Sequence, residues 1–222
     1  MFLGHIGVGL ALKRAAPSVN VGLLVAGALV ADFLLGLFIL LGLERVHVPT
    51  DFAHRHFLTF TFPWSHGLAA TAAWAGAAGG LTYGLLRGPA RAWGALVVAL
   101  AVASHFPCDA IEHVPELPLW GVASPQLGLG LWRWMPAALA LEVALAVWGL
   151  LLYRRASPGA FPLGMALLLV ALAALALPGQ LLSTSAPSGQ ALVATWLLEV
   201  PLIGALAGWL DGRRQARAEK PP

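Results

Sequence analysis

The chain has 222 residues, of which 59% are hydrophobic and 10% are charged, and its formal net charge at pH 7 is +3. Soluble domains carry about 25% charged residues, so this chain has too little polar surface to cover itself in water. The composition predicts an integral membrane protein and, because no long basic stripe is present, excludes a nucleic-acid-binding module.

Apolar stretches follow one another along the chain. Residues 2–12 reach only half the length of the ~20 residues that a span needs, which fits a short tilted, re-entrant or interfacial helix. Six longer stretches are expected to cross the membrane as helices: residues 21–43, 66–86, 92–106, 134–153, 162–182 and 191–210. The sequence therefore predicts an all-α, polytopic membrane helix bundle in one domain, residues 1–210, followed by a polar cytoplasmic tail, residues 211–222.

The basic residues indicate how the bundle is oriented. They form four groups that fall on one side of a six-span topology: Lys13 and Arg14; Arg87 and Arg91; Arg154 and Arg155; Arg213, Arg214 and Arg217. Short loops rich in Lys and Arg face the cytoplasm. We therefore expect the C-terminus inside, and the uncharged loop 183–190 and the long loops 44–65 and 107–133 outside.

Ionisable side chains within apolar stretches need a partner, because each costs roughly 2.5–3.5 kcal/mol at the centre of a helix on insertion scales. Asp32 lies about eleven residues into its stretch, roughly 16 Å deep at the helical rise. It is either a protonated structural carboxyl or a metal ligand or base. His66 follows Pro63 and Ser65, and we expect Ser65 to cap a helix that has His66 in its first turn.

The segment "SHFPCDAIEH", residues 104–113, brings two histidines and two acids to the end of an apolar stretch. His105 and Asp109 have i, i+4 spacing, so on a helix they share a face and can hold one ion together. Glu112 and His113 extend that face. Pro107 disfavours an uninterrupted helix, so we expect either a kink there or a helix that restarts with Pro107 in its first turn.

His5 lies among glycines in "GHIGVG", which allow close helix approach. A lone histidine on an apolar face is usually structural, but here five ligand-type residues can meet in the outer half of one bundle. They are His5, Asp32, His66, His105 and Asp109. Three imidazoles and two carboxylates suit Zn²⁺ or another divalent transition metal.

Four segments also resemble a known family over nearly the whole chain: "GHIGVGLALKRAAP", "LVADFLL", "PWSHGL" and "SHFPCDAIEHVPELPL". They are similar to the YdjM-like family of inner-membrane metal-dependent hydrolases. More distantly, the order of Asp, His and His-x₃-Asp resembles the zinc-dependent phospholipase C and single-strand nuclease superfamily, whose members are helical and cleave phosphate esters.

The resemblance implies a bacterial-type inner membrane and a metal site. It makes metal ligands of Asp32, His66, His105 and Asp109, with Asp32 also a possible base, and it places His5 nearby as an N-terminal ligand. The superfamily's downstream His-x₃-Glu pair has no counterpart here, because Ala138 stands four residues before Glu142. The resemblance therefore implies one or two metal ions.

Together these features predict a membrane-embedded, zinc-type metal-dependent hydrolase with its site at the outer face. Its substrates would be phosphate esters such as lipid head groups or lipid-linked phosphates. The catalytic residues expected are Asp32, Glu112 and His113. The alternative is a metal-ion or small-solute transporter, since intramembrane His and Asp also mark ion paths. A transporter should connect polar groups to both faces, whereas a non-enzymatic scaffold needs no such cluster.

Overall fold

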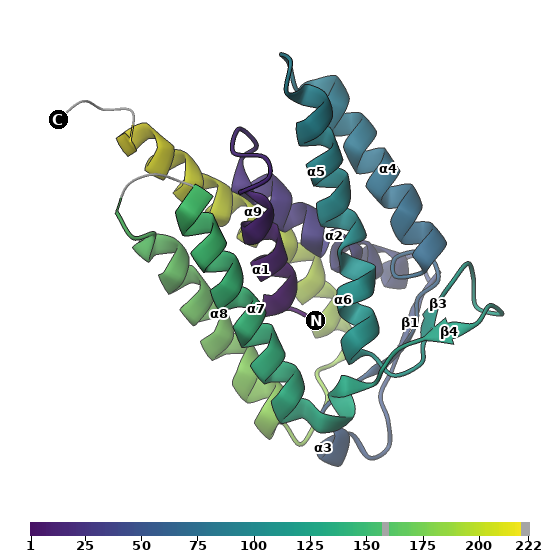
Figure 1. Ribbon diagram of the computed structural model, residues 1–222. Coiled ribbons are helices and arrows are strands. Elements are labelled where there is room, and N and C mark those ends of the chain that lie inside the picture. Colours follow the sequence, from purple (N-terminus) through teal and green to yellow (C-terminus); the bar gives the residue numbers. More distant parts are fainter. Residues whose placement is uncertain (157–159, 219–222) are drawn as a thin grey trace.

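The computed structural model describes residues 1–156 and 160–218, and its architecture is all-α (Figure 1). The longer helices are α2 (Val21–Leu40), α4 (Leu68–Leu85), α5 (Arg91–Ala103), α7 (Met135–Ala156), α8 (Leu163–Leu182) and α9 (Gly189–Ala218). The shorter ones are α1 (Leu3–Leu12), α3 (Phe52–Arg55), α6 (His105–Glu112) and the 3₁₀ helix η1 (Leu131–Trp134).

Within the described residues, five helical segments are long and apolar enough to cross a membrane: Val21–Leu40, Arg91–Glu112, Leu131–Ala156, Leu163–Leu182 and Gly189–Ala216. The prediction of six long spans is therefore wrong by one. The stretch 66–86 does form α4, but α4 consists largely of Ala and Gly, with only three leucines in 18 residues. Alanine and glycine supply helix length without the apolar surface that makes a span self-sufficient in lipid.

The short helix α1 lies inside the bundle, against α7 and α2 (Figure 1). Its glycines make this possible. A Cβ at Gly7 would lie 2.3 Å from the backbone oxygen of Leu145 in α7, and a Cβ at Gly9 would lie 2.7 Å from the Cα of Val25 in α2. Residues 2–12 are thus largely a buried interior helix, in which Leu3, Ile6 and Leu10 join the hydrophobic core.

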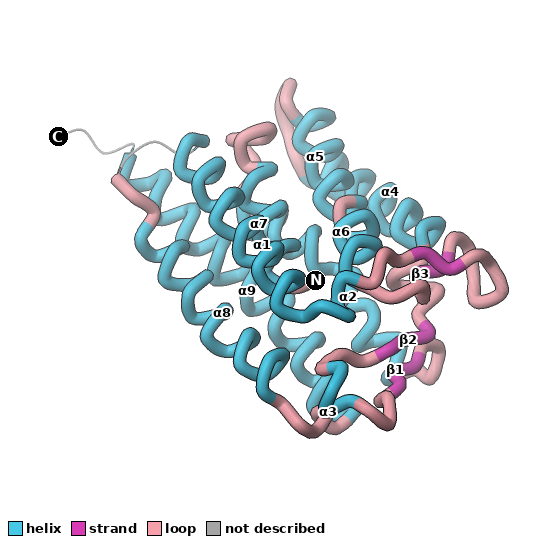
Figure 2. Tube along the Cα trace, turned by 60° about the horizontal axis from the view of Figure 1, so that its bottom comes forward, coloured by secondary structure: helices cyan, strands magenta, loops and turns pink. Residues whose placement is uncertain are grey.

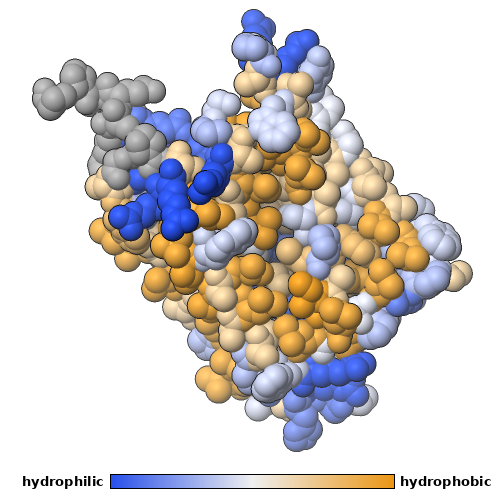
Figure 3. All heavy atoms as spheres, in the orientation of Figure 1, coloured by the Kyte–Doolittle hydropathy of each residue, from blue (hydrophilic) through white to orange (hydrophobic). Residues whose placement is uncertain are grey.

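The two long loops predicted to face outward contain small antiparallel hairpins at one end of the molecule (Figure 2), but residues 107–112 of the second predicted loop belong to α6. In the first, β1 (Arg45–His47) pairs with β2 (Thr59–Thr61), and α3 lies between these strands in sequence. In the second, β3 (Leu117–Pro118) pairs with β4 (Gln126–Leu127). Hydrophobic residues cover the middle of the face in Figure 3, with hydrophilic ones at the tip of the α4–α5 hairpin and near α3.

The C-terminal end of α9 is polar, but it remains packed against the rest of the bundle. The helix continues to Ala218, so the segment assigned to a tail is helical as far as that residue, and residues 219–222 lie outside the described part. Asp211 is fully buried and forms a 2.7 Å ion pair with Lys13, which follows α1. Tyr153 of α7 also donates a hydrogen bond to Asp211, at 3.0 Å. This polar cluster joins α1, α7 and α9.

Candidate metal centre

The helix carrying the His-x₃-Asp motif restarts at the motif, as one of the two sequence alternatives predicts. α5 ends at Ala103, Ser104 keeps a helical backbone conformation, and α6 begins at His105, with Pro107 in its first turn. Proline is tolerated there because the first-turn N–H groups have no partner within the helix. His105 and Asp109 consequently share a face, and His105 Nε2 lies 3.1 Å from Asp109 Oδ2.

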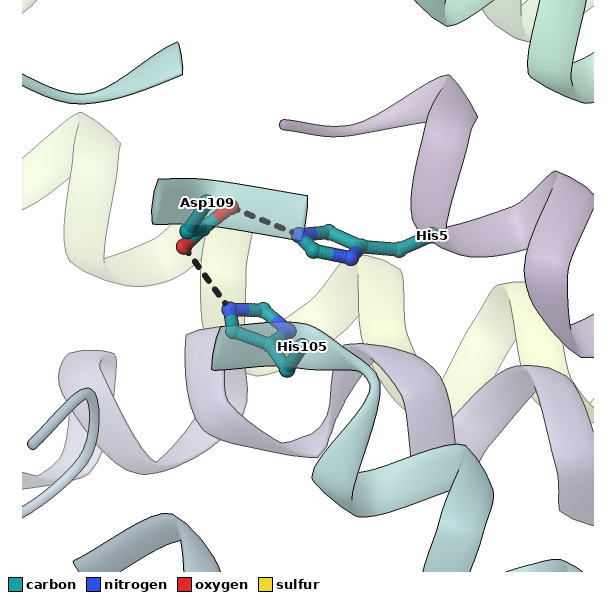
Figure 4. Close-up of side chains that lie close together, drawn as sticks. All are labelled: His5, His105 and Asp109. Carbon is teal, nitrogen blue, oxygen red and sulfur yellow. Dashed lines mark hydrogen bonds and ion pairs between the residues drawn. The ribbon is translucent and has the colours of Figure 1, made fainter. Parts of the chain in front are cut away.

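The structure brings together all five residues predicted to bind metal, from α1, α2, the turn before α4, and α6. Two overlapping triads of side chains have ligand atoms close enough for one ion: His5, His105 and Asp109, and Asp32, His66 and His105. Figure 4 shows the first triad, with the His5 and His105 rings stacked at 3.9 Å and both turned toward Asp109. Four of the five residues are at most 2% exposed, and the Asp32 side chain is 17% exposed.

The ligand atoms around His66 and His105 are spaced as they would be around a metal. The two Nε2 atoms are 3.1 Å apart, and Asp109 Oδ2 lies 3.5 Å and 3.1 Å from them. Asp32 Oδ1 lies 3.6 Å and 3.9 Å from the same two nitrogens. Tetrahedral zinc with bonds near 2.05 Å places its ligands about 3.3 Å from one another. The donor types suit a divalent ion, and these five distances, 3.1 to 3.9 Å, are close to that value.

Hydrogen bonds on Nδ1 determine which tautomer the neutral rings of His66 and His105 adopt. His105 Nδ1 donates to the carbonyl of Ala28 at 2.7 Å, so Nδ1 carries a proton and the neutral ring has its lone pair on Nε2. His66 Nδ1 lies 2.7 Å from the Ser65 hydroxyl oxygen. Because Ser65 donates its own proton to Glu44 at 2.6 Å, the serine oxygen accepts from His66. When both rings are neutral, two Nε2 lone pairs face each other, an arrangement that a cation between them stabilises.

Glu112 and His113, predicted as catalytic, lie beside the centre. Glu112 is fully buried; its Oε2 accepts a hydrogen bond from Trp132 Nε1 at 3.0 Å, and its Oε1 has no hydrogen-bond partner among the described residues. His113 Nε2 lies 3.5 Å from Asp109 Oδ2, and its Nδ1 donates to Glu116 at 2.7 Å. Burial lowers the pKa of His113 below its ordinary value, which favours the neutral ring.

Several neighbours of the centre were not predicted. The Met1 amino group lies 2.8 Å from Asp109 Oδ1 and 3.4 Å from Glu112. Glu142 of α7 accepts the backbone N–H groups of Phe2 and Leu3 at 2.7 and 2.6 Å, which anchors the start of α1. Its place in an apolar stretch marks Glu142 as a residue that needs partners, but the sequence does not indicate which ones.

Ser65 is also placed differently from expectation. α4 begins at Leu68 and is preceded by Gly67, so Ser65 is not its N-cap, and its hydroxyl group bonds to Glu44 and His66 instead. Glu44 lies in the loop after α2. Burial raises the pKa of its carboxyl above the ordinary value, while hydrogen bonds from Ser65 and Trp64 act in the opposite direction. Neither contact has a signal in the sequence.

A pocket of about 240 Å³ opens near the centre, between the two hairpins. It is lined by Phe60, Thr61, Phe62, Pro63, Pro115, Glu116, Pro118, Val122 and Gln126. Glu116 holds His113, and the Phe62 ring lies 4.6 Å from the ring of His66, so this wall of the pocket adjoins the centre.

No family model, curated protein or solved structure matches this chain. The function of this chain is therefore inferred from the geometry and chemistry of the site.

Proposed function

We propose that the protein is a membrane-embedded, metal-dependent hydrolase that holds one divalent ion, of which Zn²⁺ is the best fit, between His66, His105, Asp109 and Asp32. The observation that carries the proposal is that the two Nε2 atoms lie 3.1 Å apart, with an oxygen of Asp32 and one of Asp109 within 3.9 Å of both. His105 has a single lone pair, because its Nδ1 donates to Ala28, so the two overlapping triads cannot each hold an ion through this ring.

The other residues have roles that follow from their contacts. His5 lies 2.9 Å from Asp109 Oδ1, where it orients the carboxylate and leaves Oδ2 facing the ion. Asp32 has the most exposed side chain of the set, which makes it the natural contact for an attacking water. Glu112 has a free carboxylate oxygen for proton transfer. A bound metal lowers the pKa of its water towards ~7 and polarises the scissile group.

The substrate class proposed is a phosphate ester carried on a lipid or presented at the membrane surface. Five apolar spans bring the centre to the bilayer, and the pocket beside it opens at the hairpin end, which the charge pattern predicts to be outside. The resemblance to zinc-dependent phosphoesterases points to the same chemistry by analogy.

A transporter is less well supported, because apolar residues lie between the two buried polar clusters described above. The metal centre lies at one end of α1 and the Lys13–Asp211 pair follows the other end. Between them the described core is apolar and includes Ile6, Leu10 and Val25. An ion path needs polar groups along its length.

Metal content of the purified protein tests the proposal. Asp32→Asn, His105→Ala and Asp109→Asn should each lose Zn²⁺ that the wild type retains, because each removes a ligand. His47→Ala and Asp51→Asn are matched controls, since both residues are in the hairpin region and outside the centre. Zinc retained stoichiometrically in all three site variants would refute the metal centre.

Assays of hydrolysis and of zinc transport distinguish a hydrolase from a transporter. Wild type loaded with Zn²⁺ should hydrolyse a chromogenic phosphodiester or phospholipid in mixed micelles, and the three site variants should not. Liposomes that contain the protein should take up no more ⁶⁵Zn²⁺ than control liposomes without protein. Accumulation without hydrolysis would favour the transporter.

A further inference from the structure

The His66 ring is held by a chain of hydrogen bonds that starts at Glu44, a residue outside the set predicted to bind metal. Glu44 is only 2% exposed. Its Oε1 accepts the backbone N–H groups of Trp64 and Ser65 at 2.7 and 2.8 Å, and its Oε2 accepts the Ser65 hydroxyl at 2.6 Å. Three donors on one carboxylate fix its position and require both of its oxygens to act as acceptors.

The direction of these hydrogen bonds determines which nitrogen of the neutral His66 ring carries the proton. A serine hydroxyl has one proton, and Ser65 gives it to Glu44. The Ser65 oxygen can therefore only accept from His66 Nδ1, which lies 2.7 Å away. The ring proton is thus held on Nδ1, and Nε2 presents its lone pair to His105 and Asp109.

The other Ser–His pair in the chain provides a contrast. Ser104 precedes His105 as Ser65 precedes His66. The Ser104 hydroxyl, however, donates to the carbonyl of Ala101, and His105 Nδ1 is held by Ala28 of α2. The two dipeptides are identical in sequence, but only in the first does the serine hold the ring.

We propose that Glu44 and Ser65 are positioning residues of the metal centre: Glu44 sets the direction of the hydrogen-bond chain through Ser65, and so keeps His66 in the tautomer that binds metal. The inference rests on the proposed metal-binding function. Neither side chain is among the proposed ligands, and both act through the ring of His66.

Zinc affinity, measured by competition with a chromogenic chelator, is the first test. Ser65→Ala should weaken Zn²⁺ binding about 10- to 100-fold, the usual effect of removing the group that orients a metal-bound histidine. Ser65→Thr keeps a hydroxyl group and should restore most of the affinity. Ser104→Ala is the matched control and should leave it unchanged. A Ser65→Ala variant that binds Zn²⁺ with the affinity of the wild type would overturn the inference.

The second test reverses the direction of the hydrogen bonds between Glu44, Ser65 and His66. In Glu44→Gln, the amide oxygen must face the two N–H groups of Trp64 and Ser65, which places the amide NH₂ against the Ser65 oxygen. The serine proton then turns to His66 Nδ1, and the ring proton moves to Nε2. The ¹⁵N shifts of His66, identified by their absence in His66→Ala, should report this change in metal-free protein.

The two tests also separate this inference from the function on which it rests. Wild type that binds no Zn²⁺ would refute the metal centre. The ring measurement would still be decisive for positioning, because it needs no metal. An unchanged His66 tautomer in Glu44→Gln would overturn the inference even if the wild type binds zinc.

Discussion

Gly149→Ala should move α1 away from α7 and damage the metal centre from a distance. The two helices meet at Gly7 and Gly149, where backbones are in direct contact. A Cβ at Gly149 would lie 2.0 Å from the Gly7 oxygen and 2.7 Å from its Cα. Backbone atoms cannot rotate aside as the end of a flexible side chain can, so the overlap must be relieved by moving a helix.

The required shift follows from the distances. Ordinary contact begins at 3.4 Å, so the overlap at Gly149 needs about 1.4 Å of separation. His5 precedes Gly7 by two residues on the same helix, and its Nε2 is 2.9 Å from Asp109 Oδ1. A shift of that size is enough to take this pair beyond hydrogen-bond range. Overpacking of this kind typically costs about 1–3 kcal/mol.

Thermal unfolding in detergent, followed by intrinsic tryptophan fluorescence, measures the effect. Gly149→Ala should lower the Tm and weaken Zn²⁺ binding. Gly76→Ala is the control, because a Cβ there meets no atom within 4 Å and alanine is the better helix former. Its Tm should equal or exceed that of the wild type. A Gly149→Ala protein as stable as Gly76→Ala would refute the packing argument.

Three further predictions concern the rest of the molecule. A reporter active only in the cytoplasm should be active when fused after Lys220 and silent when inserted at Ser188; the reverse result would invert the predicted orientation. Glu112→Gln should lower hydrolysis more than zinc content, as expected for proton transfer, whereas equal losses would make Glu112 a ligand. Lys13→Met should cost about 3–5 kcal/mol by leaving the buried Asp211 carboxylate without its cation, and Lys13→Met with Asp211→Asn should recover part of the lost Tm. A double variant no more stable than Lys13→Met would contradict this pairing.

The residues of the centre were predictable because charge in an apolar stretch is costly. Asp32 and Asp109 stand out in the sequence for that reason, and the i, i+4 spacing with His105 requires only local helix geometry. Their convergence with His66, from a different segment, could be proposed from the order of elements but needed a tertiary structure to be seen.

The supporting residues were not predictable, because their roles depend on contacts between distant segments. Glu44 lies in a polar loop, where an acidic residue is unremarkable, and its contact with Ser65 spans 21 residues. The turn before α4 gave a misleading signal, since Ser65 has the residue type of an N-cap but serves His66 instead. The failure at α4 itself has another cause: Ala and Gly extend an apolar stretch to the length of a span but add little apolar surface to it.

The short helix α1 explains how a polar centre can be held inside an apolar bundle. Ten residues extend only about 15 Å, which is half the thickness of the bilayer core, so α1 cannot serve as an ordinary span. Because α1 is surrounded by protein, it does not need to span the bilayer: the backbone groups at its ends can form hydrogen bonds within the protein. Glu142 accepts the N–H groups at its start, and Lys13 beyond its last turn pairs with Asp211. A half-length helix anchored at both ends in this way brings His5 to the depth of Asp109, where a full span would have continued to the surface.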